Sequence, residues 1–262
     1  MPMLFDSDLR LKRRDRSWRM GPPAFLAERI IEDMVDRLGA MNRRFDRALV
    51  VGTLAGPAID RFKPFAERLD RVDPSALVAG ATGAEPRSED SLDDVGAYDL
   101  VIALGTLDTV EALPEALMRF RLLLKPDSPL IGVMSGGETL PLLRQAMHAA
   151  DNASGRHSPH LHPRIQPAAL AGLLAEAGLQ MPVVDIDRVR LSYRDLSSLV
   201  ADLRALGATN VLAERDKRPL GRAALAAAAQ AFTSAADDRG RSIETFELLH
   251  FLGWTPSDPS ML

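Results

Sequence analysis

Short apolar runs alternate with amphipathic stretches along most of the chain. The runs Ala48–Val51, Tyr98–Leu104 and Pro129–Met134 are continuous, as is typical of strands buried on both faces of a parallel sheet. The helical stretches expected from apolar spacing are 57–68, 113–124, 140–150, 168–177, 195–206 and 222–233. Because strands and helices alternate, the pattern predicts an α/β fold with a mainly parallel, Rossmann-like sheet and helices on both faces.

Four further segments have weaker patterns. Leu69–Val72 is a short expected strand that ends at an Asp-Pro-Ser sequence, and Val183–Leu191 alternates apolar and charged positions like a half-exposed strand. Ile243–Trp254 has a mixed periodicity that permits a strand or a helix. Gly80–Val95 is rich in glycine, proline and acidic residues, so we expect a loop there with at most one short strand.

The N-terminal segment carries mixed charge. Residues 6–19 place basic and acidic side chains around Leu9, Leu11 and Trp18, which is typical of a solvated arm or short helix; a lid or partner-binding arm is the alternative. Phe25–Leu38 has the spacing of an amphipathic helix. We therefore divide the chain into an N-terminal arm and helix (1–44), a domain (45–254) with helical insertions at about 138–166 and 195–240, and a tail (255–262).

The turn after the first strand has the position of a cofactor cradle. In parallel α/β folds, the first strand–turn–helix unit gathers backbone N–H groups and a helix N-terminus that suit a nucleotide-type cofactor. Such turns have an acidic residue at the strand end and three glycines spaced two apart. The corresponding positions here are Val50, Gly52, Leu54 and Gly56. The Leu54 side chain would project into the space of the ligand, so a turn kept only as scaffold is the alternative.

Three carboxylates follow expected strands. Asp73 ends the second strand, where it could accept hydrogen bonds from a ribose diol, although Asp-Pro-Ser is also a common turn or helix cap. Asp108 and Glu111 follow the strand that ends at Leu104, and they suit a general-base pair or an acidic helix start equally well.

Composition excludes several classes of site. The chain has no cysteine, so it has no disulfide, thiolate metal site or cysteine nucleophile. His157, His160 and His162 lack a spacing known for closed zinc sites, so we expect a substrate-covering or exposed loop and no metal. No P-loop, GxSxG or Ser-His-Asp spacing is present.

Charge and hydropathy bear on partners and location. A formal net charge of −4 gives no overall attraction to nucleic acid, so we expect no nucleic-acid partner. No apolar run is long enough to span a bilayer. The N-terminus lacks the apolar region of a secretory signal, and its acidic residues disfavour a transit peptide, so we expect a cytoplasmic protein.

Several segments together resemble the class I S-adenosylmethionine (SAM)-dependent methyltransferases. The resemblance is strongest to the assembly factor 5 group of respiratory complex I (NADH:ubiquinone oxidoreductase) and its bacterial relatives, near the malonyl-carrier-protein methyltransferases of biotin synthesis. The segments that carry it are FDSDLRLKRRDRSW (5–18), YDLVIALGTLDTVEALPEAL (98–117), LLLKPDSPLIGVMSGGETLPLLRQAM (122–147), HSPHLHP (157–163), VADLRALGATN (200–210) and FELLHFLGW (246–254).

This resemblance implies a seven-stranded methyltransferase sheet whose last strand is Ile243–Leu252, with the helices of 195–240 inserted before it as a cap. It also implies SAM as cofactor and a respiratory complex I subunit as partner. The cofactor would lie over Gly52, Thr53, Leu54 and Gly56, near Asp73, and against Leu104 and Gly105. The substrate side would include His157, His160, Arg190 and Tyr193.

The chain departs from its relatives at the cofactor positions, since Val50 and Leu54 replace an acidic residue and a glycine, and Asp108-Thr109 replaces a His-Trp pair. Three hypotheses therefore stay open. The protein is a SAM-dependent methyltransferase, a protein arginine hydroxylase of complex I assembly, or a catalytically silent scaffold that binds a respiratory subunit. The sequence does not assign an oligomeric state.

Overall fold

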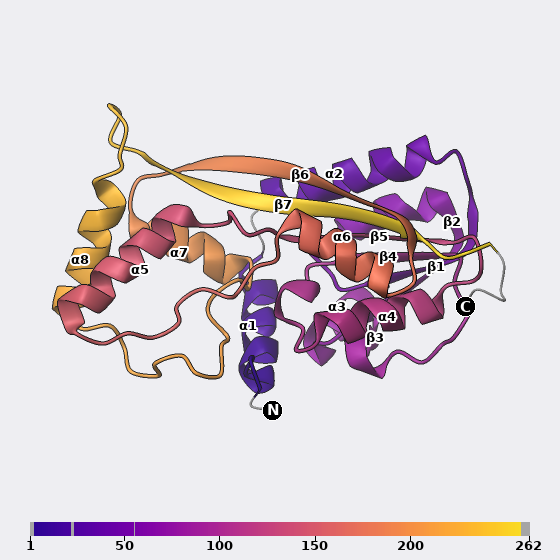
Figure 1. Cartoon of the computed structure of the whole chain (residues 1–262), viewed down its shortest axis with the longest axis horizontal. Helices are drawn as coiled ribbons and strands as arrows, with labels where there is room; N and C mark the ends of the chain where they lie inside the picture. The colour runs from indigo at the N-terminus through magenta and orange to yellow at the C-terminus, as the bar shows by residue number, and fades with distance from the viewer. Residues whose placement is uncertain (1–2, 22–23, 55, 258–262) are drawn as a thin grey trace.

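The computed structural model describes residues 3–21, 24–54 and 56–257, and a seven-stranded sheet forms its centre (Figure 1). The strand order is β3-β2-β1-β4-β5-β7-β6. Neighbouring strands from β3 to β5 are parallel, while β7 runs antiparallel to both β5 and β6. The strands are β1 (Phe45–Val51), β2 (Ala66–Asp73), β3 (Glu85–Pro86), β4 (Leu100–Leu104), β5 (Pro129–Ser135), β6 (Gln180–Tyr193) and β7 (Ser242–Trp254). The predicted α/β fold class is confirmed.

Helices connect the strands. The α-helices are α1 (Ser7–Met20), α2 (Ala24–Ala40), α3 (Ala76–Thr82), α4 (Leu113–Leu123), α5 (Pro141–Ser154), α6 (Pro167–Glu176), α7 (Leu196–Ala205) and α8 (Arg222–Thr233). Short 3-10 helices are η1 (Gly56–Phe65), η2 (Glu89–Ser91) and η3 (Leu107–Thr109). Among the described residues, no helix combines the length and apolar composition needed to cross a bilayer.

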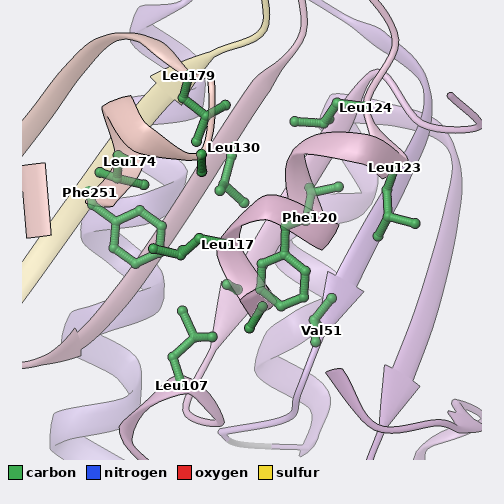
Figure 2. Packing of buried hydrophobic residues seen from close by; sticks show 14 of the residues in the cluster. Val51, Leu107, Leu117, Phe120, Leu123, Leu124, Leu130, Leu174, Leu179 and Phe251 are labelled. Carbon is green, nitrogen blue, oxygen red and sulfur yellow. The ribbon is translucent and has the colours of Figure 1, made fainter. Parts of the chain in front are cut away.

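Both faces of the sheet are buried because successive side chains of each strand point to opposite sides. On β4, Val101 and Ala103 pack into a cluster with α4 and α6, whereas Ile102 and Leu104 pack into a second cluster with α2. Figure 2 shows the first cluster, in which residues of α4 and α6 meet Phe251 of β7. This two-sided burial explains why β4, Leu100–Leu104, is apolar throughout.

Two expected boundaries were wrong. The helix expected at 57–68 is the 3-10 helix η1, and residues 66–68 belong to β2. Pro64 lies inside η1 and has no N–H to donate, which favours the change to extended backbone shortly afterwards. The second correction concerns Gly80–Val95, where α3 continues to Thr82 although we expected no helix. Ser75 caps α3 by accepting a hydrogen bond from the Val78 N–H, so the Asp-Pro-Ser sequence provides the helix cap that was considered as one of its roles.

The ambiguous segment Ile243–Trp254 is a strand, because β7 pairs with a neighbour on each side. Long-range pairing thus decides between two conformations that its own periodicity permits equally.

Helices α5, α7 and α8 form a lobe at one end of the molecule, next to the C-terminal end of β6 and the N-terminal end of β7 (Figure 1). The N-terminus of α5 has no side-chain cap of its own. Instead, the buried carboxylate of Glu244 on β7 accepts hydrogen bonds from the backbone N–H groups of Leu142 (3.3 Å) and Leu143 (2.8 Å). Because these N–H groups have no partner within the helix, Glu244 fixes the lobe to the sheet.

We predict that Gly132→Ala destabilises the protein by about 1–3 kcal/mol, because a Cβ at this position of β5 would lie 2.2 Å from the ring of Phe251. Urea denaturation measures the change in unfolding free energy. Gly80→Ala is the matched control: Gly80 lies in α3 with open space around it, so alanine should leave stability equal or raise it by up to about 1 kcal/mol. Equal effects of the two substitutions would contradict this view of the packing.

Candidate functional site

The expected cofactor turn begins where β1 ends. Gly52 has φ +89°, and a Cβ there would lie 2.1 Å from the Leu104 carbonyl oxygen. Its N–H donates to the Val72 carbonyl at 2.8 Å. Glycine is therefore required at this position by both backbone conformation and close contact with β4.

Leu54 lies against Gly105, at the point where a methyltransferase-type turn would face its ligand. Gly105 has φ +66°, and a Cβ added to it would be 2.4 Å from Cδ2 of Leu54. The half-buried Leu54 also packs on the cluster under α2. Gly56 begins η1, whereas Ala55, between Leu54 and Gly56, lies outside the described residues.

The fully buried carboxylate of Asp73 is paired with an arginine of the N-terminal helix. Arg14 Nε donates to Asp73 Oδ1 at 2.7 Å, and its Nη2 donates to the other carboxylate oxygen. The Nη2 group also donates to the carbonyl of Thr53 (3.1 Å), and Nη1 donates to that of Gly105 (3.3 Å). One guanidinium thus bridges Asp73 and two of the backbone positions to which the resemblance assigns SAM.

A second arginine of α1 binds a second buried carboxylate. Arg10 donates to both oxygens of Glu89, at 2.7 and 3.2 Å, and the Glu89 side chain is only 1% exposed. Burial by itself raises the pKa of Glu89, but the adjacent Arg10 charge and its hydrogen bonds bring the pKa below the ordinary value. Arg10 and Arg14 are one helical turn apart and therefore share a face of α1.

The sequence analysis considered residues 6–19 as a lid but did not identify these two arginines. The only local signal was their i, i+4 spacing within RLKRRDR, and that spacing does not specify which carboxylates they reach. Glu89 gave no signal at all, because it lies in a stretch that we expected to be irregular.

Little space remains at this turn. The cavity enclosed by Arg14, Trp18, Leu54 and Gly105 has a volume of about 90 Å³. Small-molecule and cofactor pockets typically have volumes of about 300–1,000 Å³. At the residues that the resemblance assigns to SAM, α1 and Leu54 therefore leave less space than a typical cofactor pocket has.

A much larger cavity of about 630 Å³ lies in the lobe between α5, α7 and α8. Its walls are mainly apolar, and most come from helical faces: Leu140, Leu143, Met147, Leu196, Val200, Leu203, Leu225 and Ala229. Leu140, Arg164 and Leu203 also line a smaller cavity that reaches Leu54 and Gly105. Leu140 has φ +63°, a strained backbone conformation for leucine of the kind that often accompanies a functional site.

Of the four expected substrate residues, only His157 and His160 lie together, since both approach the carboxylate of Asp151. His160 lines the large cavity, and its Nε2 lies 2.7 Å from Oδ1 of Asp151. Tyr193 is buried in the lobe core and donates to Asp202 at 3.0 Å, and burial, followed by this acceptor, raises its pKa well above the ordinary value. Arg190 is exposed on β6, and His157 is exposed in its loop.

The two carboxylates after β4 have separate partners. Asp108 Oδ1 accepts hydrogen bonds from Arg164 (2.7 Å) and from the Ser135 N–H (2.8 Å). Glu111 accepts the backbone N–H groups of Leu4 (2.6 Å) and Phe5 (3.0 Å). Glu111 therefore holds Leu4 and Phe5, whereas Asp108 lines the smaller cavity that reaches Leu54 and Gly105. Within the described ranges, no group of three or more histidines and acidic residues has the geometry of a metal site.

Three known proteins with similar sequences cover most of this chain. A zebrafish protein named arginine-hydroxylase NDUFAF5, mitochondrial, is 31% identical over 96% of this chain and 83% of its own length. The human protein of that name is 29% identical, over 96% and 76%. A malonyl-[acyl-carrier protein] O-methyltransferase of Xylella fastidiosa is 30% identical, over 85% and 71%.

Solved structures share the fold. The YcgJ protein of Bacillus subtilis has a TM-score of 0.58 at 11% identity, covering 87% of this chain and 98% of that one. A putative methyltransferase of Bacillus halodurans has a TM-score of 0.55 at 12% identity, covering 85% and 98%. The family described as "Methyltransferase domain" matches residues 24–182. The chain therefore belongs to the methyltransferase-domain family and has the fold of the class I SAM-dependent enzymes.

Proposed function

We propose that this protein is a catalytically silent member of the methyltransferase family that binds a protein, a subunit of respiratory complex I, without using SAM. The observation that carries the proposal is the hydrogen-bonded position of Arg14 on Asp73, Thr53 and Gly105. A ribose diol or amino group of a cofactor would have to displace these contacts.

The free-energy cost of separating Asp73 from Arg14 supports a turn that is closed to SAM. Asp73 is fully buried, so separating it from Arg14 leaves a charge with no counterion, which typically costs about 3–5 kcal/mol. Leu54 adds a steric barrier beside it, and Val50 supplies no carboxylate for a ligand amine. SAM binding would therefore have to offset the loss of a buried ion pair without the polar groups that usually hold the cofactor.

The partner is inferred from the relatives. Proteins named NDUFAF5 are about 30% identical to nearly the whole chain, and the assembly-factor group that this chain resembles acts on respiratory complex I. A scaffold role needs the fold and its surface but not a methyl donor, so it agrees with both the retained sheet and the closed turn.

Arginine hydroxylation is the second candidate, and it is favoured by the name of these same relatives. The large cavity is lined by three arginines (Arg144, Arg164 and Arg204, the second paired with Asp108) and by one carboxylate, Asp195, so its net positive charge disfavours an arginine side chain. Mass spectrometry of complex I subunits from cells with and without the gene decides the point. A gain of one oxygen on an arginine that depends on the gene would support hydroxylation and contradict the silent scaffold.

We predict that millimolar SAM leaves the melting temperature of the wild-type protein unchanged. A ligand present at about 100 times its Kd stabilises a native protein by about 2.7 kcal/mol, so differential scanning fluorimetry would detect binding readily. Leu54→Gly combined with Arg14→Ala opens the turn and should give a SAM-dependent rise, whereas Arg19→Ala, at the exposed end of α1, should behave as wild type. A SAM-dependent rise in the wild-type protein would contradict the proposal.

Arg14→Ala should lower the unfolding free energy by about 3–5 kcal/mol, because it leaves the Asp73 carboxylate buried without a counterion. In an Asp73→Ala background the same substitution should cost much less, since no orphaned charge remains. Urea denaturation of the two single variants and the double variant measures the coupling. Additive costs would show that the pair does not hold α1 in place.

Cells that lack the gene should lose NADH:ubiquinone oxidoreductase activity in their membranes, and the wild-type gene should restore it. A folded Leu54→Phe variant, which fills the turn further, should restore it equally, since a scaffold does not need this space. Thermal melting confirms that the variant is folded. Failure of a folded Leu54→Phe protein to complement would indicate that the turn binds a required ligand.

A further inference from the structure

We propose that the cavity of the lobe binds an aliphatic carboxylate, a small molecule with an unbranched apolar chain and one anionic end. This ligand is separate from the protein partner proposed above. The inference rests on the shape of the cavity, the chemistry of its walls and the charges at one of its ends.

The cavity extends along α7. It is lined by Asp195 and Ser197 at the N-terminal end of that helix and by Leu203 and Arg204 at its C-terminal end. With a rise of 1.5 Å per residue, positions 195 and 204 are about 13 Å apart along the helix axis. At about 630 Å³, the cavity falls within the usual range of roughly 300–1,000 Å³ for small-molecule sites.

Two helical faces supply the apolar walls. On α7, Leu196, Val200 and Leu203 recur at helical spacing, and on the opposite side Leu143 and Met147 of α5 do the same. Ala229 of α8 leaves room between them because its side chain is small. A mainly apolar space that extends along α7 fits an extended hydrocarbon chain better than a polar metabolite.

The two ends of the cavity differ in charge. At one end the Asp195 carboxylate is already used, because it accepts a hydrogen bond from the Ser198 N–H (2.7 Å) and caps α7. At the other end, Arg204 lines the cavity with its guanidinium exposed, and no carboxylate of the described residues forms a salt bridge with it. Arg144 of α5, also in the cavity wall, likewise has no salt bridge among the described residues, so the unpaired charges that line the cavity are positive.

Two arginines of α1 add to the positive charge at the Arg204 end. Arg16 Nη2 donates to Oγ1 of Thr209, a residue of the cavity wall, at 2.9 Å, while its buried Nε has no partner. Arg13 Nη1 is also buried without a partner. Burial, and then the nearby charges led by Arg16, lower the pKa of Arg13 to about 10, and burial followed by Arg204 lowers that of Arg16.

The three neighbouring guanidinium groups of Arg13, Arg16 and Arg204 repel one another where they are partly shielded from water. Buried N–H groups without acceptors also lower the stability of the fold. The C-terminal carbonyls of α7 offset part of this charge, since helix C-termini favour cations. A carboxylate held by Arg204 would offset more of it, with its hydrocarbon chain lying along α7. The anionic end and the apolar chain of the ligand thus match two different parts of one cavity.

Calorimetric titration of the wild-type protein with decanoate, below its micelle concentration, tests the proposal. We expect about one decanoate per chain, weaker binding of decanol by about tenfold because it lacks the charge-assisted hydrogen bonds, and no detectable binding of acetate, which lacks the chain. Absence of decanoate binding, or equal binding of decanoate and decanol, would overturn the assignment of a carboxylate ligand.

Variants locate the site. Arg204→Gln should weaken decanoate binding about tenfold and leave decanol unchanged, whereas Arg222→Gln, an exposed position outside the cavity, should change neither. If Arg204 serves only to stabilise the end of α7, the variant will melt earlier but bind decanoate as well as wild type. That result would overturn the role given to Arg204.

Ala229→Phe fills the cavity from α8 and should abolish binding, and Ala226→Phe, an exposed position on the same helix outside the cavity, is its control. Leu225→Trp is a second variant that should block the cavity. Leu225 lines the cavity and is 53% exposed, so this position can accept a larger side chain without loss of the fold. Unchanged decanoate binding in a folded blocking variant would place the ligand elsewhere and overturn the proposal. The SAM and complementation experiments are independent of these outcomes.

Discussion

The pairing of Arg14 with Asp73 joins the N-terminal helix to the carboxyl ends of the parallel strands, and the state of the whole site depends on it. Asp73 is fully buried, so it needs a counterion wherever α1 lies. Arg14 supplies that counterion and also donates to the backbone carbonyls of Thr53 in the turn and of Gly105, just after β4. As a result α1 becomes part of the wall of the site, and the same contacts that stabilise the fold close the place of a cofactor.

The sheet and the lobe are held by interactions other than the Arg14–Asp73 pair. The sheet depends on two-sided burial of β1, β4 and β5. The lobe depends on β7, because Glu244 caps α5 from a strand that is itself held on both sides. Changes in the turn can therefore accumulate without loss of the fold, and the lobe can keep a binding cavity of its own.

The turn after β1 and the cavity of the lobe are formed by different elements. Leu54 and Arg14 occupy the turn, while the cavity between α5, α7 and α8 is larger and has Arg204 in its wall. A protein with this combination can still present a surface to a partner and hold a small ligand. Shared fold and shared ancestry thus do not imply shared chemistry, because the chemistry belongs to a few positions placed on the fold.

The sequence by itself determined the fold class and the positions of most strands and helices. Continuous apolar runs and helical spacing show, within a short stretch of chain, which faces of an element are buried. The sequence also located the turn and showed that Leu54 replaces a glycine. The periodicity of Ile243–Trp254 left strand and helix open, and the strand implied by the family resemblance is confirmed by its pairing on both sides. Tertiary structure alone placed Arg10 and Arg14 on Glu89 and Asp73, because these contacts join residues 59 to 79 positions apart, and local spacing carries no information about such distances.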